Sequence, residues 1–344
     1  ARLAAYRSGV FSTRRLPCKV ISIGNITVGG TGKTPFTICA AELVHRWGLR
    51  TAVISRGYKG EAERRGTVVS DGSRLLVSPQ VAGDEPYLLA ARLRQLSVPV
   101  LAGRDRIRIG LQAIEKFHPD VILLDDGFQH IRLARDVDVV LLDGRKPFGN
   151  SHLLPRGALR EPVSSLHRAD LFVLTRSEAN AKQLHPDPAE KVQPRLPQRP
   201  IFAAAHRPAL RAWIEAGHNR GIEQLLVSGS HDKQRLAGRR VFAFSGIAGN
   251  NAFRQSLTDL DIDVGGFIGF ADHHAYSSDD LRRLQDEAHA CSADCFCTTD
   301  KDWVKIAGQA NWPLPVVVMG VDISLGQDTP GFEQQLRSLL HLND

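Results

Sequence analysis

Short, mostly apolar runs recur along the first half of the chain and are separated by segments long enough for helices. They lie at 20–23, 51–54, 121–124, 139–142 and 171–174. The runs do not alternate with polar positions, which is typical of strands buried on both faces of a parallel sheet. A helical pattern over 33–47 follows the first run. Strand, helix and strand in series predict an α/β fold with a mostly parallel sheet flanked by helices, of the kind found in P-loop NTPases.

Prolines and charged residues interrupt this pattern between 177 and 238. We interpret this stretch as a connector with little core of its own and room for a short hairpin. Apolar runs resume at 241–244, 264–270, 295–297 and 316–318, with a helical pattern over 279–290, and they predict a second, smaller α/β unit. A last helical stretch, 332–340, has an apolar face that fits either unit.

The chain therefore divides into five expected parts. They are an N-terminal arm over 1–19, a larger domain over 20–176, the Pro-rich connector over 177–238, a smaller α/β domain over 239–330 and a C-terminal helix over 331–344. A length of 344 residues fits two domains. The 42% hydrophobic and 24% charged content is that of a globular protein and excludes collagen, a disulfide scaffold and overall disorder.

Charge narrows the classes of partner. The net charge is 44 − 37 = +7, which suits nucleic acid, an anionic membrane surface or phosphorylated substrates. Residues 1–20 hold five basic side chains and no acid.

The chain has five cysteines, an odd number, which favours a reducing compartment. No apolar run approaches the ~18 residues of a membrane-spanning helix.

A glycine-rich segment directly follows the first expected strand and opens the first expected helix. Its residues are Thr27, Val28, Gly29, Gly30, Thr31, Gly32, Lys33 and Thr34. Glycines allow a tight turn that aims backbone N–H groups at phosphate oxygens, and the helix N-terminus adds further donors. Lys33 is placed to reach the β- and γ-phosphates, and the Thr34 hydroxyl to bind Mg²⁺. The formal pattern has Gly where this chain has Thr27, but the context still predicts a nucleoside triphosphate site.

Two acids, Asp125 and Asp126, end the expected strand at 121–124. Ligands of doubly wound folds bind at this carboxyl edge of the sheet, where an acid holds Mg²⁺ directly or through water. The sequence leaves open which of the two does so. Gln129 and His130 continue the same loop and are candidate substrate contacts.

Several other polar loops are candidates for the acceptor side of a reaction. They contain Asp84 and Glu85, Arg56 and Tyr58, and Arg160 and Glu161. Helix capping by Asp84 is the simpler alternative for the first, and an exposed turn for the other two. In the second unit a carboxylate, two histidines and a tyrosine cluster over 272–276, where a metal site, a structural histidine pair and a catalytic His273 or His274 are the alternatives.

The phosphate loop and the paired acids fit an ATPase, a GTPase and a kinase equally well. A common GTPase would carry N-K-x-D, and the segment 299–302, T-D-K-D, lacks the Asn. A kinase needs an acceptor hydroxyl and usually a carboxylate to take its proton. A nucleotide-switched binding module is the alternative, whereas a phosphoesterase of the Asp-His-His type lacks a phosphate loop. Cys295 and Cys297 flank Phe296 in a strand-like run, so we expect buried thiols there rather than zinc ligands.

Taken together, these segments resemble the family of tetraacyldisaccharide 4′-kinases, which phosphorylate the lipid A precursor of Gram-negative bacteria. The matching segments are in the family's order at 24–35, 55–58, 83–86, 125–130, 154–157, 159–162, 244–247 and 270–274. The set is specific, although each segment alone is not. Thr27 fits as well, because this family's loop departs from the strict pattern.

The resemblance implies an enzyme that transfers the γ-phosphoryl group of ATP to the 4′-hydroxyl of tetraacyldisaccharide 1-phosphate, making lipid IVA. Lys33 would hold the phosphates, and Thr34 with Asp125 and Asp126 would manage Mg²⁺ and the acceptor end. Asp84 resembles the general base and is expected to pair with His273 of the second unit, while the neighbouring His274 also satisfies the motif.

The resemblance also implies that Arg160 and Glu161 line the same cleft. It places the protein at the cytoplasmic face of the inner membrane, peripheral or N-terminally anchored. The family has a hydrophobic N-terminal segment, and we expect the arm 1–19 to be its remnant because the chain opens with Ala1. The expected partners are the lipid A disaccharide precursor and an anionic membrane surface, with no nucleic acid and no obligate protein partner. Arg7, Arg14 and Arg15 would then help the arm dock on anionic lipid.

Overall fold

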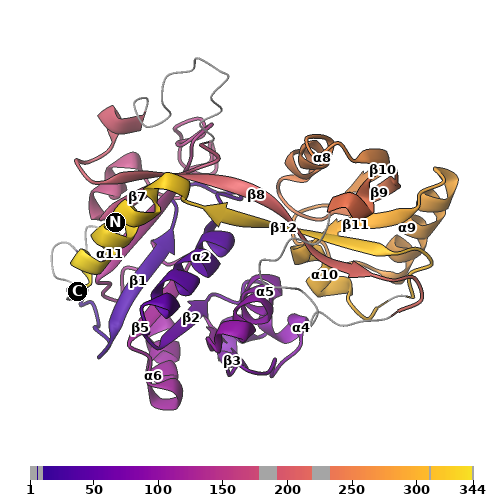
Figure 1. The fold of residues 1–344 in the computed structure, drawn as a ribbon. Helices are drawn as coiled ribbons and strands as arrows, with labels where there is room; N and C mark the ends of the chain where they lie inside the picture. Colours follow the sequence, from indigo (N-terminus) through magenta and orange to yellow (C-terminus); the bar gives the residue numbers. More distant parts are fainter. Residues whose placement is uncertain (1–5, 7–10, 178–191, 219–232, 310, 343–344) are drawn as a thin grey trace.

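One twelve-stranded sheet runs through the protein in the order β10-β9-β11-β12-β8-β7-β6-β1-β5-β2-β4-β3. The computed structural model describes residues 6, 11–177, 192–218, 233–309 and 311–342. Figure 1 shows a larger part (11–177) and a smaller part (240–306), with two long strands running from one to the other. The prediction of a mostly parallel sheet with flanking helices is confirmed.

The larger part contains the predicted strands and two short ones that the sequence pattern missed. Its strands are β1 (Lys19–Gly24), β2 (Thr51–Ser55), β3 (Thr67–Ser70), β4 (Val100–Ala102), β5 (Val121–Asp125), β6 (Val137–Asp143) and β7 (Leu171–Thr175). Its helices are α2 (Lys33–Arg46), α3 (Ala62–Arg65), α4 (Pro79–Ala82), α5 (Asp84–Leu93) and α6 (Arg106–Phe117). Only β3, at the sheet edge, pairs antiparallel among these strands of the described chain.

Both faces of this sheet are buried, which is why its strands lack polar alternation. Ile21 and Leu123 pack on one face with side chains of α2 and α5. Val20 and Ile122 point to the other face and pack with α6. β1 and β5 pair in parallel with Ile23 opposite Asp125, so the phosphate-loop side of β1 and the acids after β5 meet at one edge.

The smaller part repeats the α/β pattern. It contains β9 (Arg240–Ser245), α8 (Asn250–Thr258), β10 (Asp263–Gly269), α9 (Ser278–Ala290), β11 (Cys295–Thr299) and α10 (Asp300–Ile306). Cys295 and Cys297 are buried and free, as predicted.

A single long strand lies where the sequence suggested a connector. β8 (Ile201–Ile214) begins parallel to β7 and then pairs antiparallel with β12 (Val316–Ser324). The expectation of little core is wrong for β8, because its Leu210, Ala212 and Ile214 are buried. Residues 178–191 and 219–232 of the expected connector lie outside the described residues. The domain boundaries drawn from the sequence remain a prediction.

The C-terminal helix packs on the larger of the two parts, a choice that the sequence left open. α11 (Thr329–Leu339) lies on the larger part, where Phe332 meets Phe36 edge to face at 5.7 Å and Phe202 at 5.4 Å. On the arm, Leu16 is buried against the α6 side of the sheet and Arg15 pairs with Asp136 at 2.8 Å. Arg7 lies outside the described residues.

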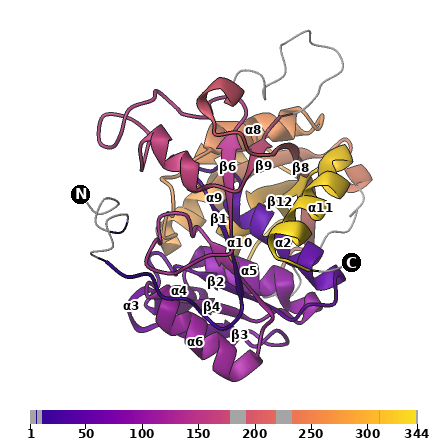
Figure 2. The ribbon, with the colours of Figure 1, turned by 90° about the vertical axis from the view of Figure 1, so that its left-hand side faces the viewer.

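Helix α5 belongs to the cores of both parts. Leu89 packs in the cluster of the larger sheet. Leu88 and Ala91, on another side of the helix, pack in the cluster that contains Trp303 and Val304 of α10. Figure 2 shows α5 and α10 side by side. The helix that begins with Asp84 is therefore fixed against the smaller part.

Candidate active site

The predicted phosphate loop leaves β1 and enters α2 with both of its ends anchored. At the entry, the Val28 N–H donates to the Ala158 carbonyl at 2.7 Å. At the centre, Asn25 donates to the Thr31 hydroxyl at 2.9 Å, and the Thr175 hydroxyl donates to the Thr31 carbonyl at 3.0 Å. Gly32 caps α2 with a φ of 87°, a conformation that glycine adopts without strain. These contacts hold a glycine turn at a helix N-terminus, the geometry that binds phosphate.

Asp125 is buried behind this loop. Its two carboxylate oxygens accept hydrogen bonds from Thr37 and Ser55, each at 3.1 Å. Burial, followed by the negative charges of Glu85 and Asp126, raises the pKa of the Asp125 carboxyl to about 6. A nearby cation would favour the ionised form of this carboxyl.

Asp126 faces two cations. Arg160 donates to both of its carboxylate oxygens, at 2.8 and 2.9 Å, and the Lys33 Nζ lies 3.7 Å away. Burial opposes ionisation of Asp126, but the charges of Lys33 and Arg160 outweigh it and keep its pKa below the usual range. The backbone of Asp126 has a φ of 54°. This left-handed conformation is uncommon outside glycine.

The residues around the loop fit a magnesium ion by the chemistry of their donors. Thr34 is buried at the start of α2 and offers a hydroxyl, while Asp125 and Asp126 offer carboxylates. Mg²⁺ is commonly bound by one or two carboxylates together with substrate phosphates and water. Within the described ranges, no group of three or more His, Cys, Asp or Glu side chains is arranged to hold a metal ion by itself.

The Asp84 carboxylate and the His273 imidazole meet although they are 189 positions apart in the chain. The Nδ1 of His273 lies 2.8 Å from Oδ2 of Asp84. Burial opposes ionisation of Asp84, but the hydrogen bond and charge of His273 outweigh it and lower its pKa. The hydrogen bond to Asp84 raises the pKa of His273. The two groups therefore favour a carboxylate beside an imidazolium.

The sequence left two histidines open, and the structure distinguishes them. His274 bonds Asp280 at 3.0 Å, and Asp280 belongs to the capping box at the start of α9. His273 has a φ of 57° and lies against the Tyr58 ring with centroids 5.5 Å apart. The pair that Asp84 forms is thus with His273, and Tyr58 lies beside it.

Glu85 connects this pair to the phosphate loop. Its Oε1 lies 2.6 Å from Nζ of Lys301, the second residue of α10. The charge of Lys301, with a further contribution from Lys33, lowers the pKa of Glu85. Glu85 in turn raises the pKa of Asp125. The Asp84–His273 pair and the acids behind the phosphate loop therefore lie within one electrostatic cluster. Lys301 was not predicted in the site, and the T-D-K-D segment was its only signal.

Other predicted residues take supporting positions. Gln129 donates to the Asn25 carbonyl at 2.8 Å, so it holds the start of the phosphate loop. Glu161 pairs with Arg168 at 2.9 Å rather than with a cation of the loop. Arg56 pairs with Glu63 at 2.8 Å. The backbone N–H of His130 donates to the Gly127 carbonyl at 2.8 Å, which closes the turn after Asp126.

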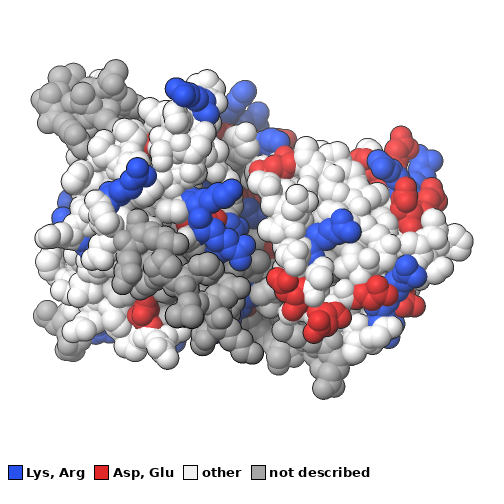
Figure 3. Space-filling model, turned by 90° about the horizontal axis from the view of Figure 1, so that it is seen from above, with Lys and Arg blue, Asp and Glu red and all other residues white. Residues whose placement is uncertain are grey.

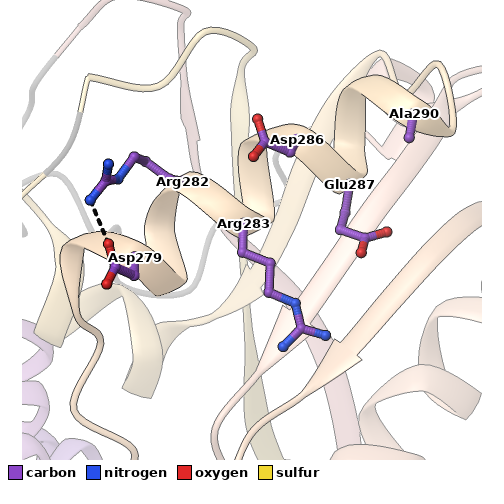
Figure 4. A pocket seen from close by; sticks show the side chains of 6 residues that line it. All are labelled: Asp279, Arg282, Arg283, Asp286, Glu287 and Ala290. Atoms are coloured by element: carbon purple, nitrogen blue, oxygen red, sulfur yellow. Dashed lines mark hydrogen bonds and ion pairs between the residues drawn. The ribbon is translucent and has the colours of Figure 1, made fainter.

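The surface hollow of about 540 Å³ along α9 contains none of these residues. Figure 4 shows its lining, which comes from one helix and consists mostly of charged side chains: Asp279, Arg282, Arg283, Asp286, Glu287 and Ala290. Arg282 bonds Asp279 there, and the hollow is open to solvent. It has the features of a solvated helix face and adds nothing to the candidate site.

Comparison with known proteins agrees with this geometry. A family model described as tetraacyldisaccharide-1-P 4′-kinase matches residues 1–341. A protein named tetraacyldisaccharide 4′-kinase from Syntrophus aciditrophicus (strain SB) is 40% identical over 324 residues, covering 92% of this chain and 83% of that protein. One of the same name from Desulfatibacillum aliphaticivorans is 36% identical over 344 residues, covering 100% of this chain and 89% of that protein.

A solved structure extends the similarity to the fold. The crystal structure of LpxK from Aquifex aeolicus in complex with ATP superposes with a TM-score of 0.73 at 31% identity. The match covers 98% of this chain and 94% of that one. In the part of the present chain that the structure describes, no helix is both long and apolar enough to cross a membrane.

Proposed function

Because this chain belongs to the tetraacyldisaccharide-1-P 4′-kinase family, we propose that it transfers the γ-phosphoryl group of ATP to the 4′-hydroxyl of tetraacyldisaccharide 1-phosphate. The observation that carries this proposal is the contact between Asp84 and His273 together with the charge interactions by which the adjacent Glu85 reaches Lys33 and Asp125 of the phosphate site. A phosphate loop alone would serve any nucleotide hydrolase. A paired carboxylate at the same site supplies what transfer to an alcohol needs.

The phosphate half binds and neutralises the donor. Lys33 and the N-terminus of α2 would contact the phosphates. In doing so, Lys33 would exchange its 3.7 Å contact with Asp126 for phosphate oxygens. Thr34, Asp125 and Asp126 would hold Mg²⁺, which when bound neutralises phosphate charge. Arg160 stays with Asp126 and keeps that carboxylate ionised and oriented. Such positioning and charge neutralisation supply most of the catalysis in phosphoryl transfer.

The base half prepares the acceptor. His273 holds Oδ2 of Asp84, so Oδ1 is left to accept the proton of the 4′-hydroxyl. The hydroxyl oxygen then forms its bond to the γ-phosphorus while the bond to the bridging oxygen of ADP breaks, and the proton remains on Asp84. The neighbouring imidazolium stabilises the carboxylate before the transfer. Tyr58 is 46% exposed and packs edge to face against His273, and it would contact the sugar.

The lipid part of the acceptor calls for apolar surface near the phosphate loop. Val28, Leu153 and Leu154 are 43%, 46% and 52% exposed. Backbone hydrogen bonds place them together, since Val28 bonds Ala158 and Leu154 bonds Leu159, which bridges Thr27. We name these three residues the apolar rim. Exposed apolar groups gathered at a site are typical of contact with apolar ligands, and acyl chains of the acceptor would cover the rim.

The acceptor's chemistry also suggests where the enzyme works. A tetraacylated disaccharide lies in a bilayer, so the protein would act at the cytoplasmic face of the inner membrane, with an anionic lipid surface as partner. On the face shown in Figure 3, the charged side chains of the larger part are mostly basic, whereas the smaller part carries acidic and basic side chains together. A basic surface is attracted to anionic lipid at ~1 kcal/mol per residue close to the surface.

A transfer assay tests the proposed function. The protein is incubated with γ-³²P-ATP, Mg²⁺ and tetraacyldisaccharide 1-phosphate in mixed micelles. The lipid is then separated, and its mass is measured by mass spectrometry. We expect label in the lipid and a mass gain of one phosphate at the 4′ position. Labelled inorganic phosphate without labelled lipid would refute the kinase and favour a nucleotide hydrolase.

A further inference from the structure

The segment T-D-K-D at 299–302 forms a rigid turn at the start of α10. The Asp302 N–H donates to the Thr299 hydroxyl at 3.1 Å, and that hydroxyl donates to the Asp302 carboxylate at 2.7 Å. The same carboxylate accepts from the Gly246 N–H at 3.0 Å and pairs with Lys305 at 2.8 Å. Contacts with Thr299, Gly246 and Lys305 hold Asp302 in place. They therefore also fix the direction in which the side chain of the preceding Lys301 leaves the turn.

Lys301 leaves this turn toward α5. Its Nζ lies 2.6 Å from Glu85, and its side chain is 31% exposed. Below this contact, Trp303 and Val304 of α10 pack with Leu88 of α5 in one buried cluster. The ion pair therefore caps a packed helix–helix contact, so little side-chain entropy opposes it.

A second ionic contact holds the other end of α5. Arg92, which is 1% exposed, donates to Asp322 of β12 at 3.1 Å. The fully buried Arg211 of β8 also donates to Asp322 and lies 3.9 Å from Asp300. This network lies at the last turn of the helix, away from Asp84. It offers a structural counterpart to Lys301 on the same helix.

The first turn of α5 holds two adjacent acids, and two residues of the smaller part hold them separately. His273 bonds Asp84, and Lys301 pairs with Glu85. We propose that Lys301 is a positioning residue for the phosphoryl transfer: by holding Glu85 it fixes the first turn of α5, so that Asp84 stays bonded to His273 and faces the acceptor hydroxyl. This inference rests on the proposed function.

Electrostatics support the same role. Without Lys301, the Glu85 carboxylate would lose its main counter-charge and keep only the weaker contribution of Lys33. The negative charges of Asp84 and Asp125 would then repel it more strongly. The charge of Lys301 also helps to lower the pKa of Asp84, which keeps the base ionised. Removing the ammonium group would release the acids from their positions, and a misplacement of about 1 Å at a reacting group costs up to ~10²-fold in rate.

A set of variants tests this role. Lys301→Met removes the charge and keeps most of the side-chain volume, and we expect kcat of lipid phosphorylation to fall ~10–10²-fold with the KM for ATP nearly unchanged. Lys301→Arg keeps the ion pair and should restore most of kcat. The double variant Lys301→Met/Glu85→Gln should be no slower than Lys301→Met, because both changes remove one interaction. Arg282→Met, an exposed cation on α9, is the matched control and should leave kcat unchanged.

A spectroscopic readout separates this inference from the proposed function. The Nδ1–H proton of His273, assigned by its loss in His273→Gln, reports the bond to Asp84 in ¹H NMR without any substrate. We expect the signal in the wild type and in Lys301→Arg, and its loss or broadening in Lys301→Met. A wild type that labels no lipid would refute the kinase alone, since the NMR result would still stand.

Two results would overturn the role of Lys301. One is a folded Lys301→Met protein with wild-type kcat and an unchanged His273 signal. The other is a Lys301→Arg variant as slow as Lys301→Met, because a guanidinium can also pair with the Glu85 carboxylate. Thermal unfolding of Arg92→Met serves as a comparison for a residue that only stabilises the fold. The Tm of Arg92→Met should fall more than the Tm of Lys301→Met, because Arg92 is the more deeply buried cation.

Discussion

The two halves of the candidate site are built in different ways. The phosphate half comes from one sheet edge, where a loop after β1 and a loop after β5 meet because their strands pair directly. The base half comes from the N-terminus of α5 and a loop of the smaller part, joined by the bond between Asp84 and His273 across 189 positions. One half depends on local chain geometry, and the other depends on how two parts of the protein pack.

This difference predicts different failures. Damage to the phosphate half should weaken ATP binding, because the loop contacts the donor in the ground state as well as in the transition state. Damage to the base half should slow the transfer and leave ATP bound. Variants that mix these two patterns would show that the division is wrong.

The largest effect is expected for Asp84→Asn. The amide cannot accept the proton of the acceptor hydroxyl as a carboxylate does, and loss of a general base typically costs ~10²–10⁴-fold in rate. Steady-state kinetics should show this fall in kcat with the KM for ATP nearly unchanged. Asp280→Asn is the matched control, because it removes the carboxylate that holds the neighbouring His274 at 3.0 Å. Unchanged turnover in Asp84→Asn would remove Asp84 from the mechanism.

Lys33→Met should come next. Its ammonium group is expected to contact phosphate in the ground and transition states, and removing one such donor costs ~10²–10³-fold in rate. In contrast to Asp84→Asn, the KM for ATP should rise in the same kinetic experiment. A lysine that only neutralises Asp126 would leave the KM for ATP unaffected, and that result would contradict the assignment of the phosphate half.

The apolar rim should give a smaller effect that is confined to the lipid. Fully burying a leucine side chain contributes ~1.5–3 kcal/mol, and the exposed parts of Leu153 and Leu154 offer a fraction of that each. We expect Leu153→Ser/Leu154→Ser to raise the KM for the lipid acceptor about tenfold, with the KM for ATP unchanged. Leu111→Ser, on α6 and 48% exposed, is the matched control. An equal effect of both variants would mean that the rim does not contact the acceptor.

The smallest effect is the pH dependence of stability that comes from the Asp84–His273 pair. The pKa of His273 is raised, which gives stability that is present below about 6.5, the usual histidine value, and is lost as the pH rises through the raised value. The pKa of Asp84 is lowered, which gives stability that is present above its usual value of about 4 and is lost as the pH falls.

The pair therefore stabilises the fold most between about pH 4 and 6.5. The difference in Tm between the wild type and His273→Gln should be largest near pH 5.5 and should shrink at pH 8 and above. Thermal unfolding across this range measures it. A difference in Tm that stays constant with pH would show that the charged state of the Asp84–His273 pair does not contribute to the stability of the fold.

The same contrast explains what could be predicted from the sequence. β1, β5 and the loops after them were predicted nearly residue by residue, because buried parallel strands and phosphate loops leave local patterns. β8 was missed, because its Pro208 and its polar His206, Arg207 and Arg211 hide the strand pattern. Arg211 is tolerated inside the sheet only because Asp322 and Asp300 lie beside it, and both are distant in sequence.

The base half shows the same limit. The resemblance paired Asp84 with His273 but left His274 as an alternative that satisfies the same motif, and only tertiary packing distinguishes the two. Lys301 was missed as a site residue because its partner, Glu85, lies 216 positions away. The resemblance also implied that Glu161 lines the cleft. Its partner in the structure is Arg168, seven positions along the chain, and the place of Glu161 in the cleft stays a prediction.

The central claim is that a phosphate half and a base half act together in one site but have separable functions. The most direct test measures ATP affinity by equilibrium binding and the rate of ³²P transfer to the lipid acceptor on the same preparations of wild type, Asp84→Asn and Lys33→Met. We predict that Asp84→Asn binds ATP like the wild type and barely transfers label, and that Lys33→Met loses both affinity and transfer. If Asp84→Asn lost ATP affinity as strongly as Lys33→Met, or still labelled the lipid at the wild-type rate, the division of the site would be contradicted.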